Sequence, residues 1–83
     1  MKLLYFAWVR QKVGHVEEDV APPADVGTVA DLIGWLKQQG PGYQAAFEDE
    51  HLVRVAVDQE HADVTTSING AQEVAFFPPV TGG

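Results

Sequence analysis

The feature of the sequence that most restricts its fold is one amphipathic helix pattern in the middle of the chain. Apolar side chains recur there at positions i, i+3, i+4 and i+7, namely Val29, Leu32, Ile33 and Leu36. This spacing places them in a single stripe that must be buried against another element. Thr28 is a favourable N-cap residue, and Gly40 followed by Pro41 is typical of a helix end, with the glycine left-handed. The sequence therefore predicts a helix from about Val29 to Gln39.

Short segments before and after this helix are typical of strands. They cover residues 3–9, 16–20, 52–57, 64–68 and 73–77, and the second of them is more polar than the first. Residues 43–48 suggest a short helical turn that buries Phe47. Because one helix covers only one face of one sheet, the pattern predicts an α+β domain of the β-grasp kind, with a mixed sheet of about five strands covered by one main helix. We expect the first and last strands to pair in parallel, with the helix in their crossover connection.

Composition excludes several classes of protein. A chain of 83 residues is expected to form one domain. The absence of cysteine excludes disulfides, thiolate metal sites and a cysteine nucleophile. Twelve acidic against five basic side chains give a net charge of -7, which disfavours nucleic acid and favours partners with basic surfaces. Arg10 and Lys12 interrupt the first apolar run, so we expect neither an export signal nor a membrane span, and a cytoplasmic location.

The body of the chain offers little catalytic chemistry. His15, His51 and His61 are widely spaced, so we expect no metal site. Ser67 is the only serine and has no base near it in sequence. A metal-dependent hydrolase built on His61 is a remote alternative.

The C-terminal residues 78–83 carry a clearer signal, although a frayed end is the simplest alternative. Pro78 and Pro79 stiffen the exit from the last strand. Gly82 and Gly83 have no side chains, so they fit a narrow channel that leaves the terminal carboxylate open to reaction. Joining that carboxylate to AMP would create a leaving group, which a sulfur nucleophile could replace to give a thiocarboxylate.

Both ends of the sequence resemble one family. The ending Glu-Val-Ala-Phe-Phe-Pro-Pro-Val-Thr-Gly-Gly at 73–83 resembles the C-terminus of the small subunits of molybdopterin synthase. The opening at residues 2–10 resembles their first strand, and the predicted helix at Thr28–Leu36 lies where the family has its first helix. The resemblance therefore spans essentially the whole chain. Two turns depart from the family pattern, at 69–73 and at Asp58, where asparagine is common.

This resemblance implies a ubiquitin-like β-grasp sulfur carrier formed by residues 1–83, with no permanently bound cofactor. An adenylating enzyme of the ubiquitin-activating type would use ATP to attach AMP to Gly83, and a sulfur donor protein would convert it to the thiocarboxylate. The rest of the tail would give access to partner active sites: Pro78, Pro79, Val80, Thr81 and Gly82. The large subunit would contribute the catalytic side chains and pass sulfur to cyclic pyranopterin monophosphate, in a heterotetramer of two small and two large subunits.

The first strand is apolar on both faces. We expect Leu3 and Tyr5 to face the helix, while Phe6, Phe76 and Phe77 contribute to an exposed interface with the large subunit. Loops that cover Phe6 and Phe77 are the alternative. Other functions also stay open: a carrier of the thiamine type, a ubiquitin-like modifier, or an interaction module whose Gly-Gly has no chemical role.

Overall fold

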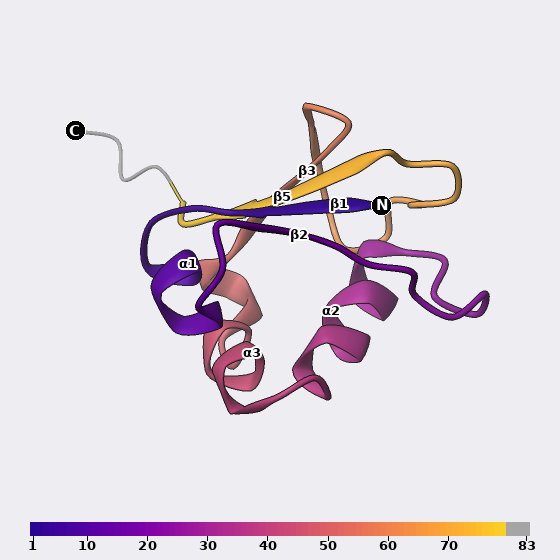
Figure 1. Cartoon of the computed structure of the whole chain (residues 1–83). Coiled ribbons are helices and arrows are strands. Elements are labelled where there is room, and N and C mark those ends of the chain that lie inside the picture. Colours follow the sequence, from indigo (N-terminus) through magenta and orange to yellow (C-terminus); the bar gives the residue numbers. More distant parts are fainter. Residues whose placement is uncertain (80–83) are drawn as a thin grey trace.

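The computed structural model describes residues 1–79 of the chain. In chain order the elements are β1 (Lys2–Tyr5), α1 (Ala7–Val13), β2 (Glu17–Asp19), α2 (Val29–Lys37), α3 (Pro41–Ala46), the 3-10 helix η1 (Glu50–Leu52), β3 (Arg54–Val57), β4 (Glu60–Ala62) and β5 (Glu73–Phe77) (Figure 1).

The strands form one mixed five-stranded sheet in the order β2-β1-β5-β3-β4. β1 pairs with β5 in parallel, and the other pairs are antiparallel. The three α-helices lie on the same side of the sheet (Figure 1), and the helices of the described part leave the other face open. Leu3 and Tyr5 face the helices and are fully buried, as predicted. The predicted α+β class, the mixed sheet and the parallel pairing of the first and last strands are therefore confirmed.

The predicted central helix forms as α2. The Thr28 hydroxyl accepts a hydrogen bond from the Asp31 N–H, and the Asp31 carboxylate accepts one from the Thr28 N–H, each at 3.2 Å. This capping box satisfies backbone donors that the first turn of a helix leaves unpaired. The whole predicted apolar stripe is buried: Val29, Leu32, Ile33 and Leu36.

The prediction of one strand over residues 3–9 is wrong beyond the end of β1. Phe6 keeps an extended backbone as the N-cap of α1, and Ala7 turns the chain with a φ of 54°. α1 then buries Val9 and Val13. An apolar run of this length does not distinguish a strand from a buried helix, and the i, i+4 spacing of these two valines is the signal that would have favoured the helix.

Three helices, not one main helix, cover the sheet. Gly40 is not the left-handed end of α2 that the sequence predicts, because it serves as the N-cap of α3. Pro41 occupies the first turn of α3, where a missing N–H removes no helical hydrogen bond. The helical turn predicted over 43–48 thus forms two residues earlier, and Phe47 at its end is fully buried.

The strand predicted over residues 64–68 is also wrong, because the fourth strand, β4, lies earlier in the chain. The carbonyls of Val64 and Thr66 instead accept hydrogen bonds from the N–H groups of Ala30 and Val29, at 2.9 and 3.0 Å. The segment therefore caps the N-terminus of α2 and satisfies its free donors.

A carboxylate shared by two tyrosines connects β1, β2 and α3. Glu18 Oε2 accepts one hydrogen bond from the Tyr5 hydroxyl and one from the Tyr43 hydroxyl, both at 2.7 Å. Burial, together with these bonds to a carboxylate, raises the pKa of Tyr5 far above its usual range and the pKa of Tyr43 to about 12. Because Glu18 lies 13 and 25 positions from its partners, no local pattern in the sequence could reveal this contact.

This network predicts an unusual alkaline titration of the tyrosine hydroxyls. The chain holds two tyrosines and both belong to the network, so no other tyrosine contributes to the signal. The folded protein should show no tyrosinate absorbance near pH ~10, where an ordinary tyrosine ionises. The unfolded chain loses these protons first, so the free energy of unfolding should be constant up to pH ~10 and fall as the pH rises further. Spectrophotometric titration and urea denaturation measure the two effects. Glu18→Gln should bring the ionisation of Tyr43 closer to the ordinary pH, whereas ordinary titration in the wild-type protein would contradict the network.

The close approach of α1 and α3 at Gly42 can be tested separately. A Cβ on Gly42 would collide with the Lys12 carbonyl oxygen, whereas one on Gly34 in α2 would meet nothing within 4 Å. We expect Gly42→Ala to lower the free energy of unfolding by about 1–3 kcal/mol, because the backbone must shift. Gly34→Ala, the matched control, should raise it by up to about 1 kcal/mol. Equal effects of the two substitutions in urea denaturation would refute this packing.

Candidate functional site

The predicted reactive tail leaves the sheet from β5, which lies between β1 and β3. The middle residues of β5 are buried, and Pro78 and Pro79 follow Phe77 directly. Neither proline has an N–H, so the strand cannot continue. We call residues 77–79 the tail root. The rest of the predicted tail, including the candidate reactive residue, lies outside the described residues: Val80, Thr81, Gly82 and Gly83.

Phe76 fixes the tail root to the core. Its ring stacks on Tyr5, with centroids 6.0 Å apart, and meets Phe47 edge to face at 5.0 Å. Its carbonyl accepts a hydrogen bond from the Phe6 N–H at 3.1 Å. The prediction that Phe76 contributes to an exposed interface is wrong, because strand alternation turns Val74 and Phe76 towards the helices, where both are fully buried.

The open face of the sheet carries an apolar centre. Leu4, Ala75 and Ala56 are paired side by side across β1, β5 and β3. Phe77 follows on the same face by strand alternation and is only partly buried. The ring of His61 meets Phe77 edge to face, with centroids 5.8 Å apart. We call Leu4, Ala56, Ala75 and Phe77 the open-face patch, and it reaches the tail root at Phe77.

Further exposed apolar side chains gather at the end of the sheet where the tail begins. Phe6, which is 48% exposed, directly follows β1, and Leu52, 50% exposed, lies two residues before β3. Val16 is 61% exposed, and its carbonyl accepts a hydrogen bond from the Tyr5 N–H at 3.0 Å. Among residues 1–79, Val64 is the one other large apolar side chain of similar exposure. Within residues 1–79 no loop buries Phe6, so the alternative of loops over this side chain is not supported. Several exposed apolar side chains therefore lie at the end of the sheet where the tail begins.

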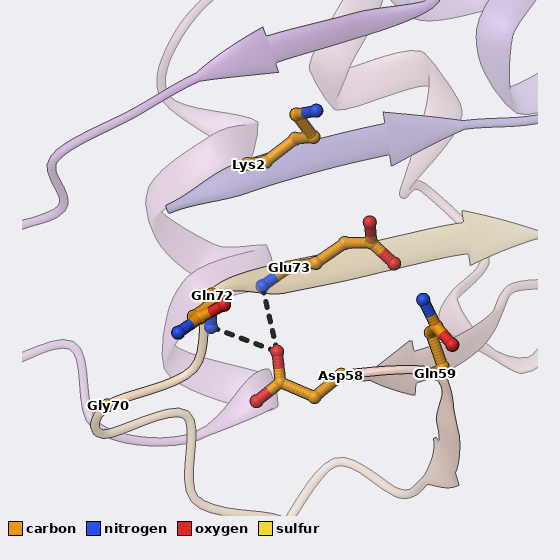
Figure 2. Close-up of a pocket in the computed structure, with 6 residues that line it drawn as sticks. All are labelled: Lys2, Asp58, Gln59, Gly70, Gln72 and Glu73. Atoms are coloured by element: carbon orange, nitrogen blue, oxygen red, sulfur yellow. Dashed lines mark hydrogen bonds between the residues drawn. The ribbon is translucent and has the colours of Figure 1, made fainter.

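A polar hollow of about 530 Å³ lies at the opposite end of the sheet, where β1 and β5 begin. Figure 2 shows one Asp58 carboxylate oxygen accepting hydrogen bonds from the backbone N–H groups of Gln72 and Glu73, at 2.9 and 3.0 Å. Asp58 has a φ of 49°, a turn conformation that aspartate tolerates. These bonds hold the β3–β4 turn against the start of β5, so the departure from asparagine at Asp58 leaves the strand register intact.

Within residues 1–79 no group of three or more His, Asp or Glu side chains is placed to hold a metal ion. None of the helices in that range is long and apolar enough to cross a membrane.

Comparison with known proteins identifies relatives over the whole chain. A model of the ThiS family matches residues 3–83. The molybdopterin synthase sulfur carrier subunit of Escherichia coli K12 is 41% identical over 83 residues, which cover 100% of this chain and 99% of that protein. The proteins of the same name from Dictyostelium discoideum and Haemophilus influenzae are 36% and 32% identical, and each alignment covers at least 94% of both chains.

Solved structures agree with this relationship. SAMP1 from Haloferax volcanii superposes with a TM-score of 0.72 at 25% identity, over 100% of this chain and 98% of that one. A putative molybdopterin converting factor, subunit 1, from Pyrococcus furiosus superposes with a TM-score of 0.71 at 26% identity, over 95% of each chain. These likenesses confirm the predicted ubiquitin-like β-grasp fold and the resemblance seen at the two ends of the sequence. The chain therefore belongs to the ThiS family.

Proposed function

We propose that this chain is the sulfur-carrier subunit of a molybdopterin synthase. The observation that carries the proposal is the tail root: a central strand is buried up to Phe76, and Pro78 and Pro79 then end the sheet pairing. Relatives of the same length named as sulfur carrier subunits of that synthase support it. The body of the domain then serves to fold, dock and present Gly83.

Sulfur loading would occur at the carboxylate of Gly83. An adenylating enzyme of the ubiquitin-activating type would join this carboxylate to AMP from ATP and release pyrophosphate. Sulfur at the sulfide level, delivered by a donor protein, would then attack the carbonyl carbon of this acyl-adenylate and displace AMP, which leaves a thiocarboxylate on Gly83. The carrier itself needs no bound cofactor for this chemistry, and because ATP is consumed we place it in the cytoplasm. Gly82 offers no side chain that would obstruct either enzyme.

Sulfur delivery would follow in the large subunit of the synthase. The tail, with Val80 and Thr81 between the prolines and the glycines, would enter the large-subunit active site. The sulfur would then pass to cyclic pyranopterin monophosphate to build the dithiolene of molybdopterin, with two carriers serving each pterin. The assembly would be a heterotetramer of two small and two large subunits, in which the large subunit supplies the catalytic side chains.

The docking surface that we propose combines Phe6 with the open-face patch. Phe77 belongs to this patch and is also the first residue of the tail root, so a partner that covers it is aligned with the tail. An apolar centre with charged surroundings is typical of specific protein interfaces. Lys2 and Glu17 on the same sheet form an exposed ion pair at 3.3 Å, which suits such a rim.

A second candidate is a ubiquitin-like modifier that joins Gly83 to lysines of other proteins. The superposition with a protein named small archaeal modifier protein 1 of H. volcanii, at a TM-score of 0.66 and 27% identity, favours it. A sulfur carrier of the thiamine type is a third, since the family model bears the ThiS name. Lysine conjugates identified by mass spectrometry would favour the modifier, and sulfur transfer to a thiamine precursor would favour the third candidate.

The first prediction concerns the chemistry of Gly83. Protein produced together with its activating enzyme and a sulfur donor should gain the mass difference of one oxygen replaced by one sulfur, located on Gly83. Deletion of Gly83 should abolish this gain, whereas a substitution far from the tail, Val64→Ala, should preserve it. Intact-mass and fragment mass spectrometry measure the change. Persistent absence of sulfur, with the Gly83 deletion harmless to function, would defeat the proposal.

The second prediction concerns docking. Phe77→Asp should weaken binding to the large subunit by about tenfold or more, because a central interface side chain typically contributes more than ~1 kcal/mol. The melting temperature should change little, since Phe77 is only partly buried. Val64→Asp, at a side chain that is 46% exposed, is the matched control and should bind normally. If Phe77→Asp lowers the melting temperature but binds the large subunit no more weakly than Val64→Asp does, this surface is not the docking site.

A further inference from the structure

A second hollow reaches the tail end of the domain from the helix side. It measures about 420 Å³ and lies between α1, α3 and η1, with Trp8 and Leu52 among its lining residues. Lys12, Glu48 and Asp49 form its polar border. We call it the Trp8–Leu52 hollow.

Two large apolar side chains of this hollow are open to solvent. Leu52 is 50% exposed, and Trp8 is only partly buried against the core. The Lys12 ammonium lies 5.6 Å from the centroid of the Trp8 ring, a distance at which a cation attracts the face of an aromatic ring. An aromatic ring beside an exposed leucine is the kind of surface that anchors a protein partner.

The position of the hollow connects it to the docking surface proposed above. Trp8 lies in the first turn of α1, two residues after the exposed Phe6. Leu52 lies two residues before Arg54, which pairs with Phe77 across β3 and β5. The hollow and the open-face patch therefore lie near the tail root on opposite sides of the sheet. In sequence, Phe6 lies between Leu4 of the patch and Trp8 of the hollow.

We propose that the Trp8–Leu52 hollow receives an apolar side chain of the large subunit, so that this subunit holds the tail root from both sides of the sheet. A lysine or arginine of the large subunit would lie beside Glu48 and Asp49, because these adjacent carboxylates border the hollow. Continuity through Phe6 favours the large subunit over the activating enzyme as the occupant. The inference rests on the proposed function, since it names a further contact with the same partner.

The main test compares two apolar side chains of similar exposure. Leu52→Asp places a charge in the hollow, whereas Val64→Asp places one outside it, with exposures of 50% and 46% in the wild-type protein. Titration calorimetry with the large subunit should show about tenfold weaker binding for Leu52→Asp and unchanged binding for Val64→Asp. Thermal unfolding of both variants checks that the loss is not due to misfolding.

Tryptophan fluorescence gives a second test of the hollow. The chain holds two tryptophans, so replacing either one with phenylalanine leaves the emission of the other. In Trp35→Phe the remaining Trp8 should shift its emission to shorter wavelength when the large subunit is added, since the ring loses water. In Trp8→Phe the remaining Trp35, which lies on α2 and does not line the hollow, should not respond.

The outcomes separate this inference from the proposed function. If the wild-type chain binds the large subunit and Leu52→Asp binds equally well with no change in Trp8 emission, the hollow is not a docking site and only this inference fails. If Leu52→Asp impairs adenylation of Gly83 but not large-subunit binding, the occupant is the activating enzyme and the inference also fails. If the wild-type chain does not bind the large subunit at all, the proposed function fails as well.

Discussion

The parallel pairing of β1 with β5 is the contact on which the rest of the structure depends. It joins strands from the two ends of the chain along residues 2–5 and 73–76, and it buries Tyr5 and Phe76 together in a stacked pair. Burial of apolar surface drives such a contact. Because parallel strands end at the same edge of a sheet, the pairing also places the start of α1 beside the start of the tail.

This arrangement divides β5 between two tasks. Its inward side chains, Val74 and Phe76, belong to the core, while its outward side chains, Ala75 and Phe77, belong to the open face. The strand is thus held firmly up to the residue before the tail root. A reactive group attached to a rigid strand loses less conformational entropy on entering a partner active site than one attached to a flexible terminus. The rigid attachment therefore favours binding. The Glu18 network adds to this rigidity by fixing Tyr5 beneath Phe76.

The sequence predicts the structure best where local signals, such as a helix cap or a pair of prolines after a strand, fix the end of an element. The last strand was predicted to the residue at 73–77, and the start of the central helix at Thr28 was predicted from its cap. The strand prediction is wrong at residues 6–9, because the apolar run there does not by itself separate strand from helix, and the second valine of the helical spacing, Val13, lies beyond the run. Prediction also failed for Phe76, since the face on which a strand residue points depends on register with neighbours far away in the chain. The Trp8–Leu52 hollow likewise joins segments that only the folded chain brings together.

The central claim is that this chain donates sulfur from Gly83 to a pterin within a molybdopterin synthase. The most direct measurement is a single-turnover reaction of the isolated thiocarboxylated chain with its large subunit and cyclic pyranopterin monophosphate. We predict that two chains lose their sulfur for each molybdopterin formed, and that the same chain with an ordinary carboxylate forms none. Retention of sulfur on Gly83 in the presence of a competent large subunit, with no molybdopterin formed, would contradict the account.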